Sequence, residues 1–226
     1  MEQTGLYDGG TGGTQCKGDG GILLRLVCLS ALEIYYPANN TGIMKKHTLH
    51  GAVILSNGCA HVFLCPTGGG KSTLTVYLHK HGLHAWTDDR AELDYDTLTV
   101  FPRSDAVALR EGGYRLLLDK GVLSPSEVEY DPDPGRERYY FQLPPCGQDS
   151  LPLGSIWLLR RGEENWTESV QKASAVRLLM ENAMDPVPIT GEYLRFLNRL
   201  SEKVKGILHY RDMEFVYDVL TRRESE

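Results

Sequence analysis

Residues 65–73, with the sequence CPTGGGKST, have types and a spacing that could bind the phosphates of a nucleotide. In a glycine-rich turn, successive backbone N–H groups can surround an anion, and the N-terminus of a following helix adds positive charge. In the G-x-x-x-x-G-K-[ST] pattern the lysine reaches the β- and γ-phosphates, and the hydroxyl group binds Mg²⁺. The segment therefore predicts a phosphate-binding loop of the Walker A type. Its predicted binding residues are Thr67, Gly68, Gly69, Gly70, Lys71, Ser72 and Thr73.

One residue departs from this pattern, because Cys65 stands at the position of the first glycine. Cysteine is small and fits there if its backbone dihedral angles stay in the β region. Two other interpretations remain open at this point: a purely structural glycine turn, and a site that responds to oxidation of the Cys65 thiol. The flanking sequence favours phosphate binding, because a strand is predicted before the loop and a helix after it.

The elements around the loop are predicted from apolar periodicity and turn residues. Apolar residues at 53–55 and 61–64 predict two strands joined by a turn at 56–58. One face of a helix after the loop is marked by Leu74, Tyr77, Leu78 and His81. Gly82 is expected to end that helix, and 84–89 predicts a short strand that ends in two aspartates.

Asp88 and Asp89 lie 17 and 18 residues after Lys71. One helix and one short strand fill that gap, so the chain is expected to return beside the strand that precedes the loop. Ligand sites in such sheets lie outside the carboxyl ends of the strands, which predicts that both carboxylates face a bound triphosphate. One could bind Mg²⁺ while the other accepts a proton from an attacking hydroxyl. A merely hydrophilic strand end is the alternative.

Residues 49–93, which run from LHGAVIL to DDRAEL, resemble the kinase core of the HPr kinase/phosphorylase family. That core combines a Leu-His-Gly or similar strand, a glycine loop, a helix ending in a glycine turn, and an Asp-Asp pair. The resemblance covers 47–220 more loosely, and its most specific part is the short spacing between the loop and the two aspartates. It implies the mixed-sheet fold of these P-loop kinases, which share their phosphate-site architecture with phosphoenolpyruvate carboxykinases.

The resemblance implies a kinase that uses ATP and Mg²⁺ to transfer the terminal phosphoryl group to a hydroxyl. By position, Asp88 corresponds to the proposed catalytic base, and Asp89 lies beside it near the metal, together with Ser72. His50 corresponds to the family's histidine near the active site, and Lys71 completes the catalytic set. His50 could equally be a strand histidine with an internal partner.

The acceptor is less well defined than the donor site. The chain lacks the family's Glu-Arg-Gly signature, of which ALREGGYRL at 108–116 is only a loose echo, and no large separate N-terminal domain is expected. It is more similar to the small stand-alone members, which implies a serine of a peptide or protein as acceptor. A small-molecule hydroxyl kinase and a nucleotide-binding regulatory protein without turnover are the alternatives. A carboxykinase-like lyase is disfavoured, because no set of substrate-carboxylate and manganese ligands is recognisable.

Composition narrows the remaining classes of partner. The net charge of −6 over 226 residues argues against a general nucleic-acid or anionic-membrane binder. The five cysteines form no C-x-x-C pair, so neither a disulfide framework nor a structural zinc site is indicated, and a cytoplasmic location is expected. The apolar run 22–36 contains Arg25 and Glu33 and is too short to span a bilayer. The composition does not exclude assembly into a homo-oligomer.

The chain is predicted to hold a flexible glycine-rich tail at 1–21 and a single α/β domain with a mixed sheet and C-terminal helices at 22–226. Further elements predicted in this domain are one or two buried strands at 22–36, a hairpin at 92–102, a long proline-rich surface loop at 129–154 and a strand at 155–162. Apolar residues at helical spacing predict two helices, one with Val176, Leu179, Met180 and Ala183 and the other with Tyr193, Phe196, Leu197, Leu200 and Val204. A last helix is predicted near 212–223.

Two further groups of side chains could contribute to a site. His79, His81 and His84 lie close together in sequence, but a solvated helix end is favoured over a metal site. An arginine clamp on the transferring phosphoryl group could come from arginines in segments expected around the site. These are Arg103, Arg110, Arg136 and Arg138.

Overall fold

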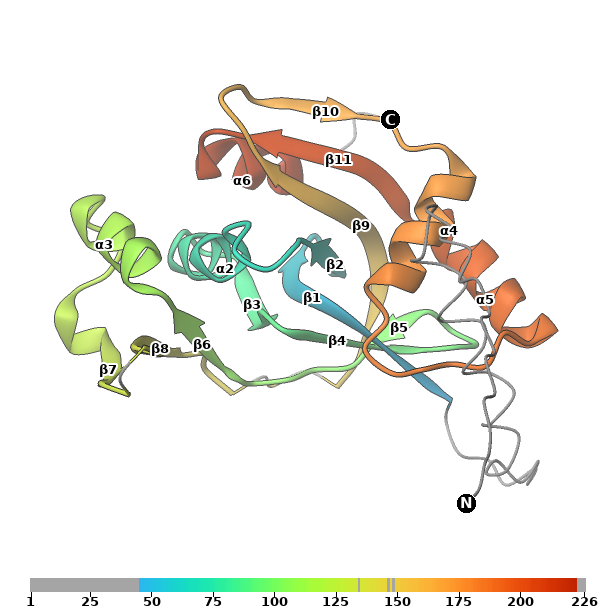
Figure 1. Cartoon of the computed structure of the whole chain (residues 1–226), viewed down its shortest axis with the longest axis horizontal. Coiled ribbons are helices and arrows are strands. Elements are labelled where there is room, and N and C mark those ends of the chain that lie inside the picture. Colours follow the sequence, from blue (N-terminus) through green and yellow to red (C-terminus); the bar gives the residue numbers. More distant parts are fainter. Residues whose placement is uncertain (1–44, 134, 146, 148, 223–226) are drawn as a thin grey trace, which may run out of the picture. The chain divides into compact units, whose positions relative to one another are not determined.

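The structure is a computed structural model in which residues 45–133, 135–145, 147 and 149–222 are described. All of them belong to the unit Gly42–Glu226. The tail predicted at 1–21 and the strands predicted at 22–36 lie outside the described residues. The described chain is α/β, with a mixed sheet and several helices, as predicted (Figure 1).

Two sheets are present among the described residues, one of eight strands and one of three. In chain order the strands are β1 (Lys46–Ser56), β2 (Cys59–Leu64), β3 (His84–Thr87), β4 (Arg90–Asp94), β5 (Thr99–Val100), β6 (Ala106–Leu109), β7 (Val128–Asp131), β8 (Arg138–Gln142), β9 (Leu151–Arg161), β10 (Trp166–Glu168) and β11 (Val204–Tyr210). The helices are α2 (Lys71–Lys80), α3 (Glu111–Asp119), α4 (Lys172–Glu181), α5 (Gly191–Ser201) and α6 (Met213–Thr221). The larger sheet has the order β10-β11-β9-β2-β1-β4-β5, and β3 pairs with β1.

β1 and β2 form the predicted hairpin that leads into the glycine loop. Ser56 pairs with Cys59, and the two turn residues Asn57 and Gly58 have positive φ angles of 51° and 74°. A type I′ turn requires positive φ at both positions, and Asn-Gly is its preferred sequence. On the other side of β2, β9 pairs in parallel, and β11 pairs in parallel with β9, so the sheet is mixed.

The prediction that β3 lies beside the loop strand is wrong. β3 pairs antiparallel with β1, because the hairpin places β1 on one side of β2 and β9 occupies the other side. β2 and β3 still run in the same direction, since both are antiparallel to β1. Their carboxyl ends therefore reach the same edge of the sheet, where the loop begins and where Asp88 follows β3.

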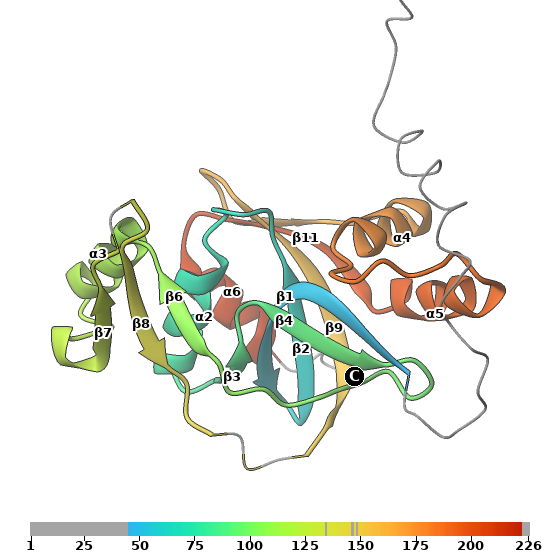
Figure 2. The ribbon, with the colours of Figure 1, turned by 60° about the horizontal axis from the view of Figure 1, so that its bottom comes forward.

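The prediction of a long irregular loop at 129–154 is also wrong. This segment contains most of β7 and all of β8, which form the smaller sheet with β6. The aromatic run 139–141 favours a strand. Of the described prolines in this segment, those at 132, 144 and 145 lie outside the strands, where their missing N–H breaks no ladder, and Pro152 is the second residue of β9. Helix α3, which follows β6, was not predicted, and Gly112 and Gly113 lower its helix propensity (Figure 2).

Helix α5 ends earlier than its apolar spacing predicts. It stops at Ser201, and Val204 begins β11. Helical spacing happens to continue to Val204, but parallel pairing with β9 inside the sheet requires an extended backbone there. The hairpin within 92–102, the strand within 155–162 and helices α2, α4 and α6 are confirmed.

Helices cover both faces of the larger sheet. On one face, Ala52, Ile54 and Phe63 pack in an apolar cluster with residues of α2 and α6. On the other face, Val53 and Val62 pack with residues of α4 and α5. Side chains that alternate between the two faces of β1 and β2 thus bury both, which anchors the strand that carries the loop.

His47 on β1 is a buried histidine outside the predicted site. It is 1% exposed, and neither ring nitrogen has a hydrogen-bond partner in the described structure. The rings of Tyr95, Tyr193 and Phe196 surround it. Burial lowers the pKa of His47 to about 4, although the Asp185 carboxylate opposes that shift.

We expect the free energy of unfolding to fall as the pH decreases from 6.5 toward 4. In this window the unfolded chain binds a proton at His47 and the folded chain does not, so the stability that is fully present above pH 6.5 is lost on acidification. The shift corresponds to about 3 kcal/mol. Urea unfolding of the parent and of His47→Leu at pH 7 and pH 5 measures this change in the free energy of unfolding. The variant His84→Ala, which alters an exposed histidine, is the control. An equal loss of stability in parent and His47→Leu would contradict this assignment.

Candidate functional site

The loop 65–70 links β2 to the N-terminus of α2. Gly68 and Gly70 have positive φ angles of 85° and 92°, which glycine adopts without steric cost. The N–H of Gly69 donates to the carbonyl oxygen of Pro66 at 3.0 Å and closes the turn. Helix α2 begins at Lys71 and has no acidic residue in its first turn, so its N-terminal N–H groups and dipole favour an anion.

Lys71, His50 and Asp89 form a chain of contacts at the mouth of the loop. Lys71 Nζ donates to His50 Nε2 at 2.9 Å, and His50 Nδ1 lies 3.0 Å from Asp89 Oδ1. Because an ammonium group can only donate, His50 accepts at Nε2 and carries its proton at Nδ1. His50 therefore has a polar partner on each side, and it orients the Asp89 carboxylate.

Ser72 and Asp88 form a second contact at the same place. The Ser72 hydroxyl donates to Asp88 Oδ2 at 2.5 Å. Asp88 is 8% exposed, whereas the Asp89 side chain is 55% exposed. The two neighbouring aspartates thus differ: one is buried against the first turn of α2, and the other faces solvent beside His50.

Burial leaves two charges of this site only partly compensated. It lowers the pKa of Lys71, although Asp88 and Asp89 oppose that shift. It also raises the pKa of Asp88, against the hydrogen bond from Ser72 and the charge of Lys71. In both groups the loss of solvation destabilises the charged form more than the neighbouring charges and hydrogen bonds stabilise it. An added anion near Lys71 or an added cation near Asp88 would stabilise these charges.

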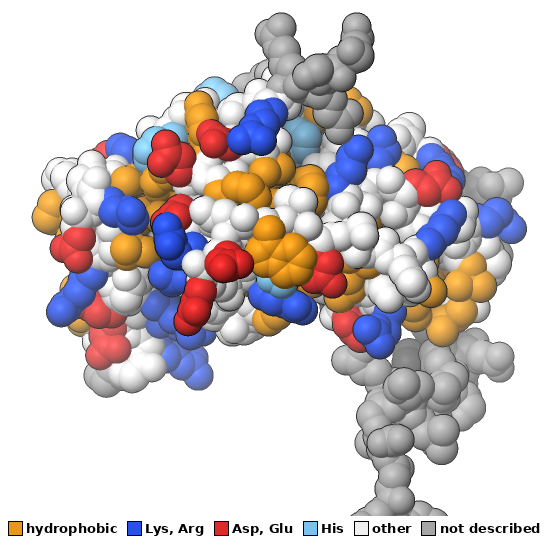
Figure 3. Space-filling model, turned by 90° about the horizontal axis from the view of Figure 1, so that it is seen from above, with side chains coloured by type: hydrophobic (Ala, Val, Ile, Leu, Met, Phe, Trp, Pro, Cys, Tyr) orange, Lys and Arg blue, Asp and Glu red, His pale blue; other side chains and the backbone are white. Residues whose placement is uncertain are grey.

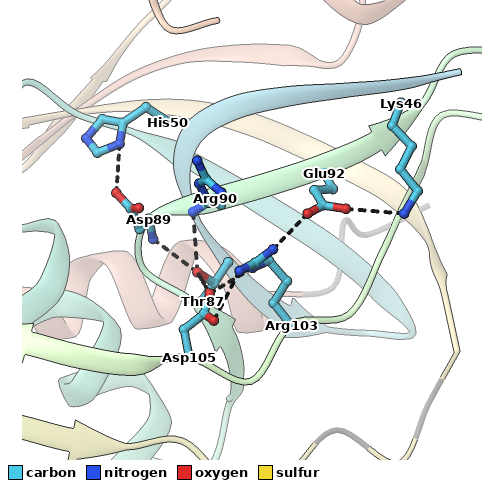
Figure 4. Close-up of polar contacts among 8 residues, drawn as sticks. All are labelled: Lys46, His50, Thr87, Asp89, Arg90, Glu92, Arg103 and Asp105. Atoms are coloured by element: carbon cyan, nitrogen blue, oxygen red, sulfur yellow. Dashed lines mark hydrogen bonds and ion pairs between the residues drawn. The ribbon is translucent and has the colours of Figure 1, made fainter. Parts of the chain in front are cut away.

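Thr87, at the end of β3, holds the turn that carries the aspartates. Its Oγ1 accepts the N–H groups of Asp89 and Arg90 at 3.2 and 3.3 Å. The same hydroxyl donates to Asp105 Oδ2 at 3.2 Å (Figure 4). This hydroxyl therefore connects the turn to the segment before β6.

Arg103 completes the network shown in Figure 4. Its Nε donates to Asp105 Oδ2 at 2.8 Å, and its Nη1 donates to Glu92 Oε1 at 2.8 Å. Lys46 reaches the other oxygen of Glu92 at 3.3 Å. Arg103, predicted as part of an arginine clamp, is thus neutralised by two carboxylates and supports the turn.

A cavity of about 770 Å³ opens over the loop and the aspartates. All predicted site residues except Gly69 line it: His50, Thr67, Gly68, Gly70, Lys71, Ser72, Thr73, Asp88 and Asp89. Six cationic side chains line it against three carboxylates, in a chain whose net charge is −6. Lys and Arg side chains also gather on the α3 side of the face shown in Figure 3, with acidic side chains among them.

The arginines of the cavity are only partly those predicted. Arg103, Arg110 and Arg138 line it, and Arg136 does not. Sequence reasoning missed two others, Arg90 and Arg161. Arg90 directly follows the aspartate pair, which was an available signal. Arg161 comes from the end of β9, and only the parallel pairing of β9 with β2 brings it to the site.

Cys65 lies beneath the loop, in the apolar cluster between the sheet and α2. A Cβ built on Gly69 would lie 2.1 Å from Cys65 Sγ, so the thiol occupies the space that a larger residue at position 69 would need. Burial raises the pKa of the Cys65 thiol, which lowers its thiolate fraction and its reactivity toward oxidants.

Tyr210, at the end of β11, supports the loop from another direction. Its buried hydroxyl donates to the carbonyl oxygen of Gly69 at 3.1 Å. A Cβ on Gly70 would lie 2.6 Å from that hydroxyl, so position 70 requires glycine for space as well as for its backbone angle. Burial raises the pKa of Tyr210 to about 12, which keeps the hydroxyl protonated as a donor. Sequence reasoning missed this residue, because β11 was not predicted.

Cys65→Gly is expected to keep or tighten nucleotide binding, because the thiol lies outside the mouth of the loop. The lost burial and the added backbone freedom should lower the free energy of unfolding by about 1–3 kcal/mol. Gly69→Ala should weaken binding, since its methyl group would overlap the thiol, and the double variant with Cys65→Gly should recover it. Calorimetric titration with Mg²⁺-ATP and urea unfolding measure both effects. Loss of binding in Cys65→Gly, or a double variant as weak as Gly69→Ala, would contradict this packing.

The oxygen atoms of Ser72 and Asp88 fit the ligand preference of Mg²⁺. This ion keeps several waters and is usually held by one or two carboxylates together with substrate phosphates. Within the described ranges, no group of three or more His, Cys, Asp or Glu side chains could hold a metal by itself. Of the three histidines at 79, 81 and 84 that were considered as a metal site, His81 has its ring stacked on that of Tyr77, with 3.9 Å between the ring centroids.

In the part of the chain that the structure describes, no helix combines the length and apolar character needed to cross a membrane. No protein-family model matches the chain, and a search of curated proteins found no match. Its function is therefore inferred from the residues of the site.

Proposed function

We propose that this protein is a kinase that uses ATP and Mg²⁺ to transfer the terminal phosphoryl group to a hydroxyl acceptor. The observation that carries the proposal is the 2.5 Å contact between Ser72 Oγ and Asp88 Oδ2 at the N-terminus of α2, next to the buried Lys71. A structural glycine turn needs neither the lysine nor the carboxylate. Phosphoryl transfer needs donors for the phosphates and oxygen ligands for the metal, and this site offers both.

The charges of the site support a polyanionic ligand with a bound cation. Burial acts against the charged forms of Lys71 and Asp88, as their pKa shifts indicate. A triphosphate beside Lys71 and Mg²⁺ beside Asp88 would supply the opposite charges that both lack. The excess of cations around the cavity in an acidic chain favours anionic ligands in general.

In this proposal the backbone N–H groups of the loop and Lys71 bind the β- and γ-phosphates. Ser72 and Asp88 hold Mg²⁺, which would neutralise part of the phosphate charge when bound. The hydrogen bond from the Tyr210 hydroxyl holds the Gly69 carbonyl group in the direction of Tyr210. Neighbouring N–H groups of the loop then remain free to point at an anion.

Asp89 is proposed to accept the proton of the acceptor hydroxyl, with His50 orienting it. Asp89 is half exposed and lines the cavity, and His50 Nδ1 lies 3.0 Å from its Oδ1. Asp88 is less suited to this role, because it is buried and already accepts the Ser72 hydroxyl. This division of roles is the reverse of the one that the family resemblance implies, in which Asp88 is the base and Asp89 lies near the metal.

The acceptor is proposed to be a serine of a peptide or protein, with a small-molecule hydroxyl as the alternative. The test incubates the full chain with Mg²⁺ and ATP labelled at the γ-phosphate, and follows label transfer to serine peptides and to small hydroxyl compounds. Acceptor-dependent transfer that requires Mg²⁺ is the expected result. Mg²⁺-ATP binding without transfer to any acceptor would favour the regulatory protein without turnover. A chain that binds no nucleotide would contradict the proposal.

A further inference from the structure

The smaller sheet carries two arginines side by side on the wall of the cavity. Along β6, the small residues Ala106 and Ala108 line the cavity, and Arg110 continues this alternation just past the strand. β6 and β8 pair antiparallel up to the residue before Arg110, so the register places Arg138 opposite it. Both arginines line the cavity, and the alanines leave open space next to them.

Arg138 has no carboxylate partner among the described residues. Its Nη1 donates to the backbone carbonyl of Glu137 at 2.8 Å. Asp131 lies opposite it on β7, but Asp131 Oδ1 accepts the N–H of Asp133 at 3.2 Å and forms no ion pair with Arg138. Most of the donors of this guanidinium therefore remain available to a ligand.

Arg110 is placed between the phosphate loop and Arg138. Its Nη1 lies 3.8 Å from the point where a Cβ on Gly68 would stand. Glu111, its neighbour in sequence, contacts Arg115, and Arg110 forms no ion pair within the described part of the chain. Arg138 lies one strand farther from α2, on β8 (Figure 2). Like charges opposite each other on a sheet are destabilising, and an anion between them would remove that cost.

The phosphates of a nucleotide do not require this second pair of cations. The loop N–H groups, the dipole of α2 and Lys71 already surround the place of the phosphates. We propose that Arg110 and Arg138 bind an anionic group of the acceptor, a carboxylate or a phosphate, so that the acceptor is an anionic hydroxyl compound. This inference rests on the proposed kinase function and names the substrate class of the same site.

The test uses the full chain saturated with Mg²⁺ and a non-hydrolysable ATP analogue, which fills the γ-phosphate position. Calorimetric titration compares glycerol, glycerate and glycerol 3-phosphate, which share hydroxyl groups and differ in the anionic group. A second comparison uses a short peptide with serine between two glutamates and its glutamine counterpart. These two comparisons separate small-molecule from peptide sources of the same anionic chemistry.

The anionic probes of at least one comparison are expected to bind about tenfold or more tightly than their neutral counterpart. Arg138→Gln should weaken their binding by about ten- to hundredfold and leave the affinity for the ATP analogue unchanged, because the variant loses charged hydrogen bonds to the anionic group alone. Arg136→Gln is the matched control, since it removes the same charge two residues away and outside the cavity lining.

Equal affinity for anionic and neutral probes in both comparisons would overturn the inference. So would an Arg138→Gln variant that weakens only the ATP analogue, because Arg138 would then belong to the nucleotide site. A chain that does not bind the ATP analogue contradicts the proposed kinase function, and this inference falls with it. Binding of the analogue without any preference among the probes contradicts this inference alone.

Discussion

Lys71→Ala is expected to abolish measurable phosphoryl transfer and to weaken nucleotide binding while the fold stays intact. The Lys71 ammonium stands at the N-terminus of α2, where, within the described residues, it donates one hydrogen bond, to His50. Removing one preorganised hydrogen-bond donor to the charge that develops in a transition state typically costs a factor of about 10²–10³ in rate. Single-turnover transfer and calorimetric titration with Mg²⁺-ATP measure the two losses, and a thermal unfolding curve checks the fold.

Lys80→Ala is the matched control for this variant. Lys80 lies at the other end of the same helix, contacts Glu127 and does not line the cavity. It should bind and turn over nucleotide like the parent. Ordinary activity in a properly folded Lys71→Ala variant would show that the glycine loop does not bind phosphate in the way proposed.

Asp88→Asn and Asp89→Asn are expected to lose activity for different reasons. Asp88→Asn removes the carboxylate beside Ser72, so the Mg²⁺ concentration needed for half-maximal transfer should rise by about tenfold or more. Asp89→Asn keeps the size of the side chain and removes the proposed proton acceptor. Transfer should fall on the order of a hundredfold or more, with Mg²⁺-ATP affinity unchanged. Mg²⁺ titrations and single-turnover transfer, measured on both variants with one acceptor, separate the two effects.

The reverse outcome has an equally clear meaning. If Asp88→Asn loses transfer at an unchanged Mg²⁺ requirement while Asp89→Asn raises that requirement, then Asp88 is the base, as the family resemblance implies. Parent-like transfer by both variants would exclude either aspartate from catalysis. His50→Gln refines the result, because a residue that only orients Asp89 should lower transfer less than Asp89→Asn does.

Local sequence was sufficient for the elements that carry the site. Asn57-Gly58 selects a tight hairpin because both residues tolerate positive φ, and the observed register follows from that turn. Gly68 and Gly70 adopt the positive φ angles that a loop around an anion needs. The spacing of Leu74, Tyr77 and Leu78 defines the buried face of α2. These features depend on residues within one or two turns of each other, which is the range over which sequence patterns are informative.

Predictions failed where a local pattern competed with a distant partner. Val204 continues a helical spacing, but pairing with β9 makes it the start of β11. Prolines suggested a loop over 129–154, but the aromatic residues of β8 gain more from pairing with β6 and β7. β3 could not pair with β2, because the hairpin and β9 already occupy both sides of that strand.

The sequence by itself determined that a glycine loop, a lysine, a serine and two aspartates would meet at one edge of a sheet. Only the tertiary structure decided which aspartate is buried against Ser72 and which is exposed beside His50. It alone brought Tyr210 to Gly69 across 141 residues and set two arginines of the smaller sheet side by side. The physical reason is that such contacts depend on strand order and register. Strand order and register depend on the free energy of pairing and burying segments that are distant in the sequence. The propensities of neighbouring residues carry no information about that free energy.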